Sequence, residues 1–248
     1  MPHVRTLAVI QARMGSTRLP GKVLKRLAGD TVLGHVIGRV RAAPGIDGVV
    51  VATTSAAEDD PIVAVAEERG AGVSRGPAED VLARYAMAFG QHGGDIGVRV
   101  TADCPCLDPT LLATALDAFR SADPPADYLS NTLTRSFPRG YDFEIFGVRA
   151  LLEAAAEAQD AYCREHVTPF LYRHPERFRL REFRREDPAG TAGWRLTLDT
   201  AEDWRVLEYL FARLVPVNPL FSLGDVERLL TAEPHVLTWN QGVRQKEV

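Results

Sequence analysis

Short apolar runs rich in β-branched residues alternate with longer segments of helical periodicity, and this alternation is the strongest constraint on the fold. We expect four strands in the first half of the chain, over residues 6–11, 48–53, 72–74 and 95–101. Helical patterns fill the intervals, as at 32–42, where apolar residues recur at the 3.6-residue spacing of one helix face. Strands joined by crossover helices form parallel sheets. The pattern therefore predicts an α/β fold.

The second half continues the pattern less regularly. Extended segments are expected at 127–131, 141–146 and 179–184, with a last strand over "WRLTLDT" at 194–200. Further helices are expected from Asp60-Pro61, after Pro109, and over 149–159 and 201–214. A chain of 248 residues with 46% apolar composition can bury one sizeable core, and no repeat or long linker divides it. We predict a single domain over 1–248, with its core at about 5–215 and a C-terminal extension over 216–248.

The charge and cysteine content exclude several classes of protein. A net charge of −4 argues against general nucleic-acid binding, which is typical of basic surfaces. No apolar run approaches the roughly 20 residues of a membrane span, and the N-terminus lacks a signal-peptide core, so we expect a cytoplasmic protein. The three cysteines form no CxxC pair. We expect buried thiols, the alternative being a metal site on Cys104 and Cys106.

The loop after the first expected strand, "QARMGSTRLPGK", concentrates cations and glycines. Parallel α/β sheets bind ligands at the carboxyl ends of their strands. Glycines let the backbone approach a ligand, and hydroxyl, amide and cationic groups bind phosphates. The loop contains Ala12, Arg13, Gly15, Ser16, Arg18, Gly21 and Lys22. It matches neither the P-loop nor the GxGxxG pattern. We predict a polyphosphate site; the alternative is a solvated turn.

The same stretch, "ARMGSTRLPGK", resembles the A-R-x-G-S-x-R-[LIF]-P-x-K signature of cytidylyltransferases that activate acidic sugars, such as the CMP-ketodeoxyoctonate and CMP-sialate synthetases. From about residue 7 to 214 the chain is most similar to the spore coat polysaccharide biosynthesis protein F family, through "RGPAEDVLARY", "RVTADCPCLDP", "YDFEIF", "REHVTPF" and "LTLDTAEDW". The resemblance implies a Rossmann-like, GT-A-like nucleotidyltransferase domain with a mostly parallel mixed sheet flanked by helices. We also expect a homodimer, supported by an extended segment of the second half.

Two aspartates follow expected strands and are candidates for a metal site. Asp103 comes after the strand at 95–101, and Asp199 comes after "WRLTL". Nucleotidyl transfer concentrates negative charge that a carboxylate-bound divalent cation stabilises. A capping box accounts for Thr200 and Asp203 but leaves Asp199 without a structural duty. The resemblance implies that Asp103 and Asp199 bind Mg²⁺; the alternative is that each is a turn or capping residue.

Residues around the nucleotide are expected in three segments of the first half. Arg99 and Thr101 are two apart on one strand and therefore share a face. The resemblance places "RGPAEDVLARY" beside the base and ribose, although Asp80 could instead form a surface pair with Arg84. The expected nucleotide-binding residues are Ala12, Arg13, Gly15, Ser16, Arg18, Lys22, Arg75, Asp80, Arg99, Thr101 and Asp103.

Two motifs of the second half are candidates for the acceptor site. In "FPRGYDFEIF", strand alternation puts both acids on one face. In "REHVTPF", an arginine and a histidine suit an anion, and the neighbouring glutamate could orient the histidine. A structural histidine is the alternative. The expected acceptor-binding residues are Arg139, Asp142, Glu144, Arg164, Glu165 and His166.

Together with the resemblance, which alone implies CTP, these features predict a Mg²⁺-dependent cytidylyltransferase that transfers CMP from CTP to an acidic sugar, phosphate or phosphonate and releases pyrophosphate. The expected catalytic residues are Arg13, Arg18, Lys22, Asp103 and Asp199. The expected partners are CTP and a small anionic acceptor, without nucleic acid or membrane. The alternatives are a nucleotidyltransferase using another triphosphate, a glycosyltransferase using a nucleotide sugar, or a nucleotide-sensing module. Glycosyltransferases commonly hold their metal with a D-x-D pair, whereas Asp103 is followed by Cys104 and Pro105.

Overall fold

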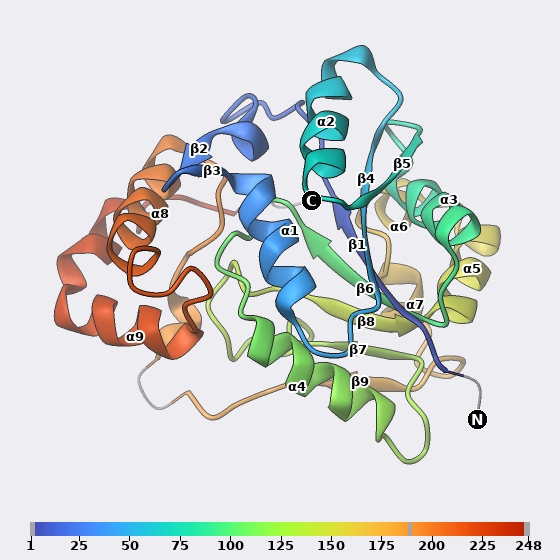
Figure 1. Cartoon of the computed structure of the whole chain (residues 1–248). Coiled ribbons are helices and arrows are strands. Elements are labelled where there is room, and N and C mark those ends of the chain that lie inside the picture. Colours follow the sequence, from blue (N-terminus) through green and yellow to red (C-terminus); the bar gives the residue numbers. More distant parts are fainter. Residues whose placement is uncertain (1–2, 188–189, 246–248) are drawn as a thin grey trace.

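Seven strands form one mixed sheet in the order β5-β4-β1-β6-β8-β7-β9 (Figure 1). The computed structural model describes residues 3–187 and 190–245. The strands are β1 (Thr6–Gln11), β4 (Gly48–Thr54), β5 (Gly72–Gly76), β6 (Ile96–Thr101), β7 (Tyr128–Ser130), β8 (Glu144–Gly147) and β9 (Leu180–Glu182). Strands β5, β4, β1 and β6 are parallel, whereas β8 runs antiparallel to both β6 and β7. Strands β2 (Arg26–Leu27) and β3 (Asp30–Thr31) form a separate hairpin.

Nine α-helices surround the sheet in the described part of the chain: α1 (Val32–Ala42), α2 (Asp60–Glu68), α3 (Val81–His92), α4 (Pro109–Arg120), α5 (Val148–Glu157), α6 (Ala161–His166), α7 (Pro169–Arg173), α8 (Ala201–Leu214) and α9 (Leu223–Ala232). The bounds of β1, α1 and α8 are those predicted from the sequence. The α/β fold with a mostly parallel mixed sheet is therefore confirmed.

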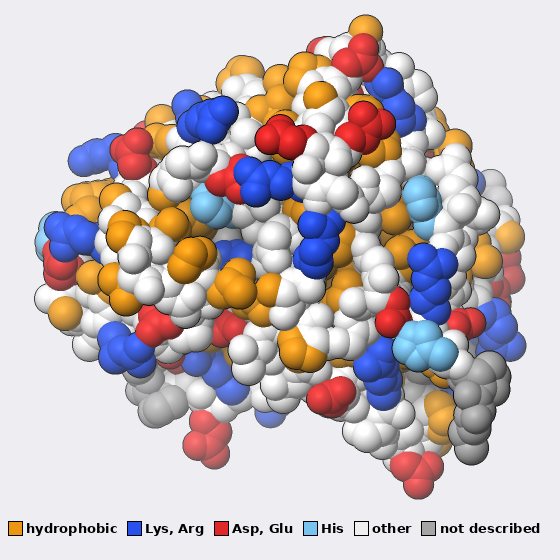
Figure 2. Space-filling model, in the orientation of Figure 1, with side chains coloured by type: hydrophobic (Ala, Val, Ile, Leu, Met, Phe, Trp, Pro, Cys, Tyr) orange, Lys and Arg blue, Asp and Glu red, His pale blue; other side chains and the backbone are white. Residues whose placement is uncertain are grey.

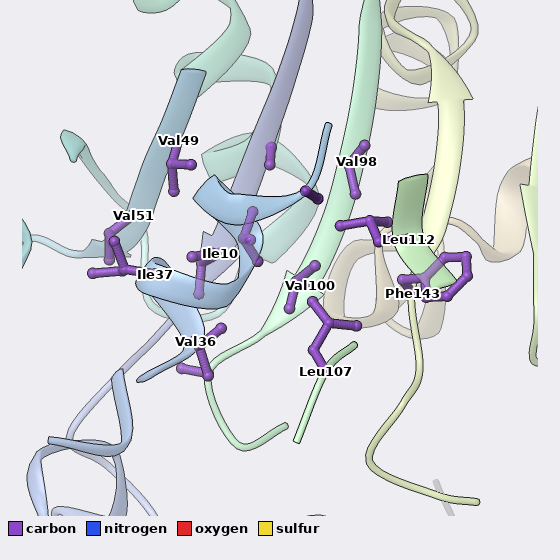
Figure 3. Close-up of a cluster of buried hydrophobic side chains, with 14 of the residues drawn as sticks. Ile10, Val36, Ile37, Val49, Val51, Val98, Val100, Leu107, Leu112 and Phe143 are labelled. Atoms are coloured by element: carbon purple, nitrogen blue, oxygen red, sulfur yellow. The ribbon is translucent and has the colours of Figure 1, made fainter. Parts of the chain in front are cut away.

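Both faces of the central strands are buried. On β1, Ala8 and Ile10 pack with α1, α2 and α4, whereas Leu7 and Val9 pack with α3 and α5 on the opposite face. Figure 3 shows the first of these layers. Ile10 of β1 lies close to Val36 and Ile37 of α1, with Val51 of β4 on one side and Val100 of β6 on the other. Burial on both sides explains why these strands are continuous apolar runs rather than alternating ones.

A third apolar cluster joins the C-terminal helices to the site loops. Leu207 and Phe211 of α8 and Val226 of α9 pack against Leu196 and Leu198. In Figure 1 these two helices lie to one side of the sheet, with α8 next to the β2–β3 hairpin. The cluster thus holds the segment just before Asp199 against α8.

The segment 194–200, predicted as the last strand, does not join the sheet. Its backbone makes one bridge, between Arg195 and Arg139, in which Leu196 N donates to Arg139 O at 2.7 Å. Leu198 N donates to Asp103 O at 2.9 Å. The alternation in "WRLTL" therefore reflects burial of the two leucines, while the backbone hydrogen bonds go to two loops.

The prediction for residues 141–146 is also wrong in part, because β8 begins only at Glu144. The side chain of Asn131 binds the preceding backbone, donating to Tyr141 O at 2.8 Å and accepting from Phe143 N at 3.1 Å. This amide takes the place of a strand partner. Asp142 consequently lies outside the strand and does not share a strand face with Glu144.

Gly140 permits the close contact between the loop at 139 and the segment 194–199. Its φ is +108°, and a Cβ at this position would lie 2.4 Å from the carbonyl carbon and oxygen of Leu196. We expect Gly140→Ala to lower the free energy of unfolding by about 1–3 kcal/mol, the typical cost of such backbone strain. Urea denaturation measures this. Gly38→Ala is the control: it is in α1 with open space around it, and is expected to stabilise the protein slightly.

Within the described ranges, none of the helices has the length and hydropathy needed to cross a membrane. Figure 2 shows basic and acidic side chains interspersed over the face that α1, α2 and α4 cover.

Candidate active site

The Lys22 ammonium is the centre of a cluster at the carboxyl edge of the sheet. Its Nζ donates to Asp103 Oδ2 and Asp199 Oδ1, each at 2.8 Å, and to the carbonyl oxygen of Leu198 at 2.7 Å. Lys22 comes from the loop after β1, Asp103 from the loop after β6, and Asp199 from the residues before α8. Arg18 also pairs with Asp199, so the structure brings four of the five expected catalytic residues into direct contact.

Asp199 is the most heavily paired carboxylate of the cluster. Besides Lys22 it binds Arg18, whose Nη2 lies 3.1 Å from Asp199 Oδ2, and Arg195, whose Nη2 lies 2.6 Å from the same oxygen. The predicted capping box of Thr200 and Asp203 is present, but Asp203 also pairs with Arg195 Nε at 2.9 Å. Asp199 therefore does hold neighbouring side chains in place, contrary to the prediction that it has no structural role. Arg195 was missed, although its four-residue spacing from Asp199 was visible in the sequence.

Electrostatics favour the charged forms of Lys22 and Asp199. Burial raises the pKa of Asp199. The Lys22 and Arg18 cations and the Arg195 hydrogen bond together lower it by more, so the pKa lies below its ordinary value. Burial lowers the pKa of Lys22, and the two aspartates outweigh this and raise it. Thr101 Oγ1 donates to Asp103 Oδ1 at 2.5 Å, so all four oxygens of Asp103 and Asp199 accept hydrogen bonds.

The loop that carries Lys22 is held at both ends. Ala12 N donates to Ala52 O of β4 at 3.1 Å, and Gly21, in the left-handed region at φ +65°, starts the turn at Lys22. Leu19 N donates to Ser16 Oγ at 3.3 Å. Within the described residues, Arg13 makes no ion pair and is exposed, as is Gly15. The loop therefore presents free cationic and amide groups beside the cluster.

Asp59, which lies in the turn between β4 and α2, fixes this loop, and sequence reasoning missed it. The fully buried carboxylate accepts from Met14 N at 2.7 Å, from Thr53 Oγ1 at 3.1 Å, and from both N and Oγ1 of Thr54. Burial raises the pKa of Asp59, but these hydrogen bonds lower it by more. The side chain thus ties the loop after β1 to the end of β4.

We expect Asp59→Asn to lower the free energy of unfolding by about 1–3 kcal/mol, because an amide has one acceptor oxygen for these four donors. The measurement is urea denaturation at pH 7, where the Asp59 carboxylate is ionised. Asp60→Asn is the matched control: its exposed carboxylate pairs with Arg75, and such surface pairs contribute little. An equal effect of the two substitutions would contradict the anchoring role of Asp59.

Two expected nucleotide-binding residues have defined partners elsewhere. Arg75 binds the carbonyl oxygens of Thr54 at 2.9 Å and Ala56 at 2.8 Å, which places it along the loop after β4. Asp80 caps α3 by accepting from Ala83 N at 2.8 Å. The alternative pair between Asp80 and Arg84 does not form, because Arg84 binds the carbonyl oxygens of the preceding turn. Their roles toward a nucleotide stay predictions.

Arg99 and Glu144 form a buried ion pair across β6 and β8. Arg99 Nε also donates to Gln11 Oε1 at 3.1 Å, while Glu144 accepts from Tyr128 OH at 2.7 Å and from the Thr168 hydroxyl. Burial lowers the pKa of Arg99, but Glu144 raises it by more. This network spans the sheet below its carboxyl edge and lies against α3 and α7.

The "REHVTPF" motif builds a strained turn next to that network. Val167 has φ 75°, unusual for a β-branched residue, and Thr168 N donates to His166 O at 2.9 Å across it. Arg164 pairs with Asp80, its Nε 3.4 Å from Oδ2, and Glu165 is exposed. Burial lowers the pKa of His166, whose Nε2 is buried without a hydrogen-bond partner in the described structure.

The six expected acceptor-binding residues therefore lie in three separate groups. In the first group, Arg139 lies beside Arg195, and Asp142 accepts from Arg135 Nη1 at 2.7 Å. Glu144 belongs to the buried network, and Arg164, Glu165 and His166 lie on α6 beside α3. The structure does not gather them into one group, and their roles toward an acceptor stay predictions.

The two aspartates of the Lys22 cluster also fit a divalent cation. Asp103 Oδ2 and Asp199 Oδ1 each lie 2.8 Å from the same ammonium, so they are separated by no more than twice that distance. Carboxylate oxygens are suitable ligands for Mg²⁺, which keeps several waters and binds substrate phosphates. Among the described residues no cluster of three or more His, Cys, Asp or Glu is suited to a metal, so a cation here would have two protein ligands.

The three cysteines are buried free thiols, as predicted. Burial raises the pKa of Cys106 to about 12 and that of Cys104 well above its ordinary value.

A model of the cytidylyltransferase family matches residues 7–211. The chain belongs to this family. The spore coat polysaccharide biosynthesis protein SpsF of Bacillus subtilis is 32% identical over 237 residues, covering 94% of this cytidylyltransferase and 96% of the relative. A cytidylyltransferase structure from Leptospira borgpetersenii superposes with a TM-score of 0.89 at 33% identity, covering 99% of this chain and 100% of that one.

The structure of a CMP:2-keto-3-deoxy-manno-octonic acid synthetase complexed with CTP shares the fold, with a TM-score of 0.63 at 18% identity over 85% of this cytidylyltransferase and 99% of the synthetase. These matches confirm the family resemblance and the Rossmann-like fold.

Proposed function

We propose that this cytidylyltransferase transfers CMP from CTP to an acidic sugar, a phosphate or a phosphonate and releases pyrophosphate, with Mg²⁺. The observation that carries the proposal is the convergence of Lys22, Asp103 and Asp199 at the carboxyl edge of the sheet. Arg18 extends this cluster toward the loop after β1, where Arg13 and the exposed amides lie. This combination of cations and two carboxylates suits a triphosphate.

The proposed reaction is an in-line substitution at the α-phosphorus of CTP. An acceptor oxygen, either an ionised phosphate or phosphonate oxygen or a sugar hydroxyl that gives its proton to water, forms a bond to this phosphorus. The bond to the bridging oxygen breaks, and pyrophosphate leaves with the electron pair. Arg13, Arg18 and Lys22 hold the β- and γ-phosphates and neutralise charge as it develops on the leaving group. A Mg²⁺ ion on Asp103 and Asp199 would supply further charge neutralisation. Lys22 then exchanges its carboxylate partners for phosphate oxygens.

The relatives support the substrate classes of this proposal. The synthetase of similar fold was solved with CTP and acts in forming a CMP-sugar acid, and SpsF is named for polysaccharide biosynthesis. We infer a comparable anionic acceptor used in building a cell-surface polymer.

Pyrophosphate release tests the proposal directly. The enzyme is incubated with Mg²⁺ and each of the four ribonucleoside triphosphates, against pooled sugar acids, sugar phosphates, phosphonates and phospho-amino acids. Release with CTP and one pool is the expected result. Release with a different triphosphate would retain nucleotidyl transfer but contradict the choice of CTP. Absence of release across all pools would contradict the proposal.

A further inference from the structure

We propose, on the basis of that function, that the pocket beside Arg139 binds the anionic group of the acceptor. This pocket has a volume of about 700 Å³, within the range of small-molecule sites. Its wall includes Arg135, Arg139, Trp194, Arg195, Asn240 and Gln245. We call it the Arg139 pocket.

The Arg139 pocket adjoins the Lys22 cluster through one shared side chain. Arg195 lines the pocket, and its Nη2 also lies 2.6 Å from Asp199 Oδ2. Asp199 in turn holds Lys22. Arg195 and Asp199 therefore lie between a molecule in the pocket and Lys22, so the pocket and the proposed phosphate site are neighbours, as the sites of two reacting substrates must be.

One arginine of the pocket, Arg139, makes no ion pair within the described part of the chain. Arg135 is paired by both oxygens of Asp142, and Arg195 by Asp199 and Asp203. Within the described ranges the half-buried Arg139 guanidinium has neither an ion pair nor a hydrogen bond. Burial, together with the Arg135 and Arg195 cations, lowers the pKa of Arg139. An anion in the pocket would relieve this repulsion.

The C-terminal residues complete the pocket, although they lie beyond the segment that matches the family. Asn240 Nδ2 donates to Arg195 O and to Asp203 Oδ1, each at 2.9 Å, and Gln245 Oε1 accepts from Arg195 Nη1 at 2.7 Å. These contacts fix both the backbone and the guanidinium of Arg195. Residues 234–245 lie outside the segment that the family model matches, so this wall is not part of what defines the family as a whole.

The lining indicates a small polar molecule with one carboxylate or phosphate group. Arg139 supplies the charge, the exposed Gln245 amide supplies an N–H donor for hydroxyl groups, and the half-buried Trp194 ring supplies an apolar surface. A sugar acid and a sugar phosphate both have this chemistry. The pyrophosphate end of the nucleotide is the competing occupant, and the experiment below distinguishes its binding from that of a sugar anion.

Isothermal titration calorimetry of the full chain with four probes tests the proposal: 3-deoxy-manno-octulosonate, glucose 6-phosphate, pyrophosphate and neutral glucose. We expect one of the two sugar anions to bind and glucose not to bind. Arg139→Gln is expected to weaken that sugar anion at least ~10-fold, the effect of losing one charged hydrogen bond. Arg139→Lys should restore part of the affinity, and Arg41→Gln, which removes an exposed arginine of α1, should not change it.

Two results would overturn the proposal: failure of both sugar anions to bind, or an Arg139→Gln effect confined to pyrophosphate. Urea denaturation of Arg139→Gln shows whether the variant is folded, and Arg139→Lys serves if it is not. The proposed function can fail separately. Arg139-dependent binding of a sugar anion without pyrophosphate release from any triphosphate would keep the pocket and reject cytidylyl transfer. If Arg139→Gln leaves pyrophosphate release from CTP unchanged, cytidylyl transfer is kept and the role of the Arg139 pocket is rejected.

Discussion

Asp103→Asn is expected to lower the rate of pyrophosphate release from CTP at least ~100-fold, the scale of losing one preorganised electrostatic group in an active site. The substitution keeps the size of the side chain and an oxygen that can accept from Thr101, but it removes the charge that faces Lys22. It also removes one of the two carboxylates that fit a divalent cation. The measurement is initial rate at saturating CTP over a series of Mg²⁺ concentrations.

The control for this prediction is Asp117→Asn, which removes an exposed carboxylate from α4 and should leave the rate unchanged. Urea denaturation shows that both variants are folded. A rate near that of the wild type at limiting Mg²⁺ would remove Asp103 from the proposed metal site.

The location of the Lys22 cluster could be predicted from the sequence, because it depends on local patterns and one general rule. Apolar runs identified β1 and β6, and parallel strands bring their carboxyl ends to one edge. Lys22 and Asp103 each follow one of these strands and had to lie near that edge. Their direct contact confirms this reasoning about position, although it leaves their catalytic roles to experiment.

The parts that could not be predicted depend on contacts between distant side chains and backbone. Asn131 replaces a strand partner for Tyr141 and Phe143, and nothing in a polar side chain's local sequence shows which backbone it will bind. For the same reason, the sequence did not show that Asp59 would bind the backbone of the loop at Met14. Arg164 and Asp80 were assigned to different substrates, yet tertiary packing pairs them.

Lys22→Met tests whether the two aspartates hold a cation, because it removes the ammonium that occupies the space between them. We expect turnover to fall at least ~100-fold. At pH 7 the free energy of unfolding should fall by about 3 kcal/mol, the usual cost of removing one partner from a buried ion pair. Lys25→Met is the control: this lysine stacks on the Trp204 ring in the same part of the chain and is expected to cost less than about 1 kcal/mol.

The pH dependence of this loss has a defined sign. In the wild type Lys22 lowers the pKa of Asp199 below its ordinary value of 3.8. That stabilisation is present above the unfolded-state pKa and is lost as the pH falls through the lower folded-state pKa. In Lys22→Met the pKa of Asp199 rises, and its protonation relieves the repulsion between the two carboxylates. The stability difference between wild type and variant should therefore shrink as the pH is lowered below about 4.

Mg²⁺ provides the decisive comparison, without any need for substrate or turnover. In the wild type the Lys22 ammonium competes for Asp103 Oδ2 and Asp199 Oδ1, so Mg²⁺ alone should change the urea midpoint little. In Lys22→Met these oxygens have lost that partner, and Mg²⁺ binding to the folded state should raise the midpoint. Adding Asp103→Asn should abolish the increase. If Mg²⁺ stabilises Lys22→Met no more than Lys25→Met, the two aspartates serve to position Lys22, and the assignment of a metal site to them is wrong.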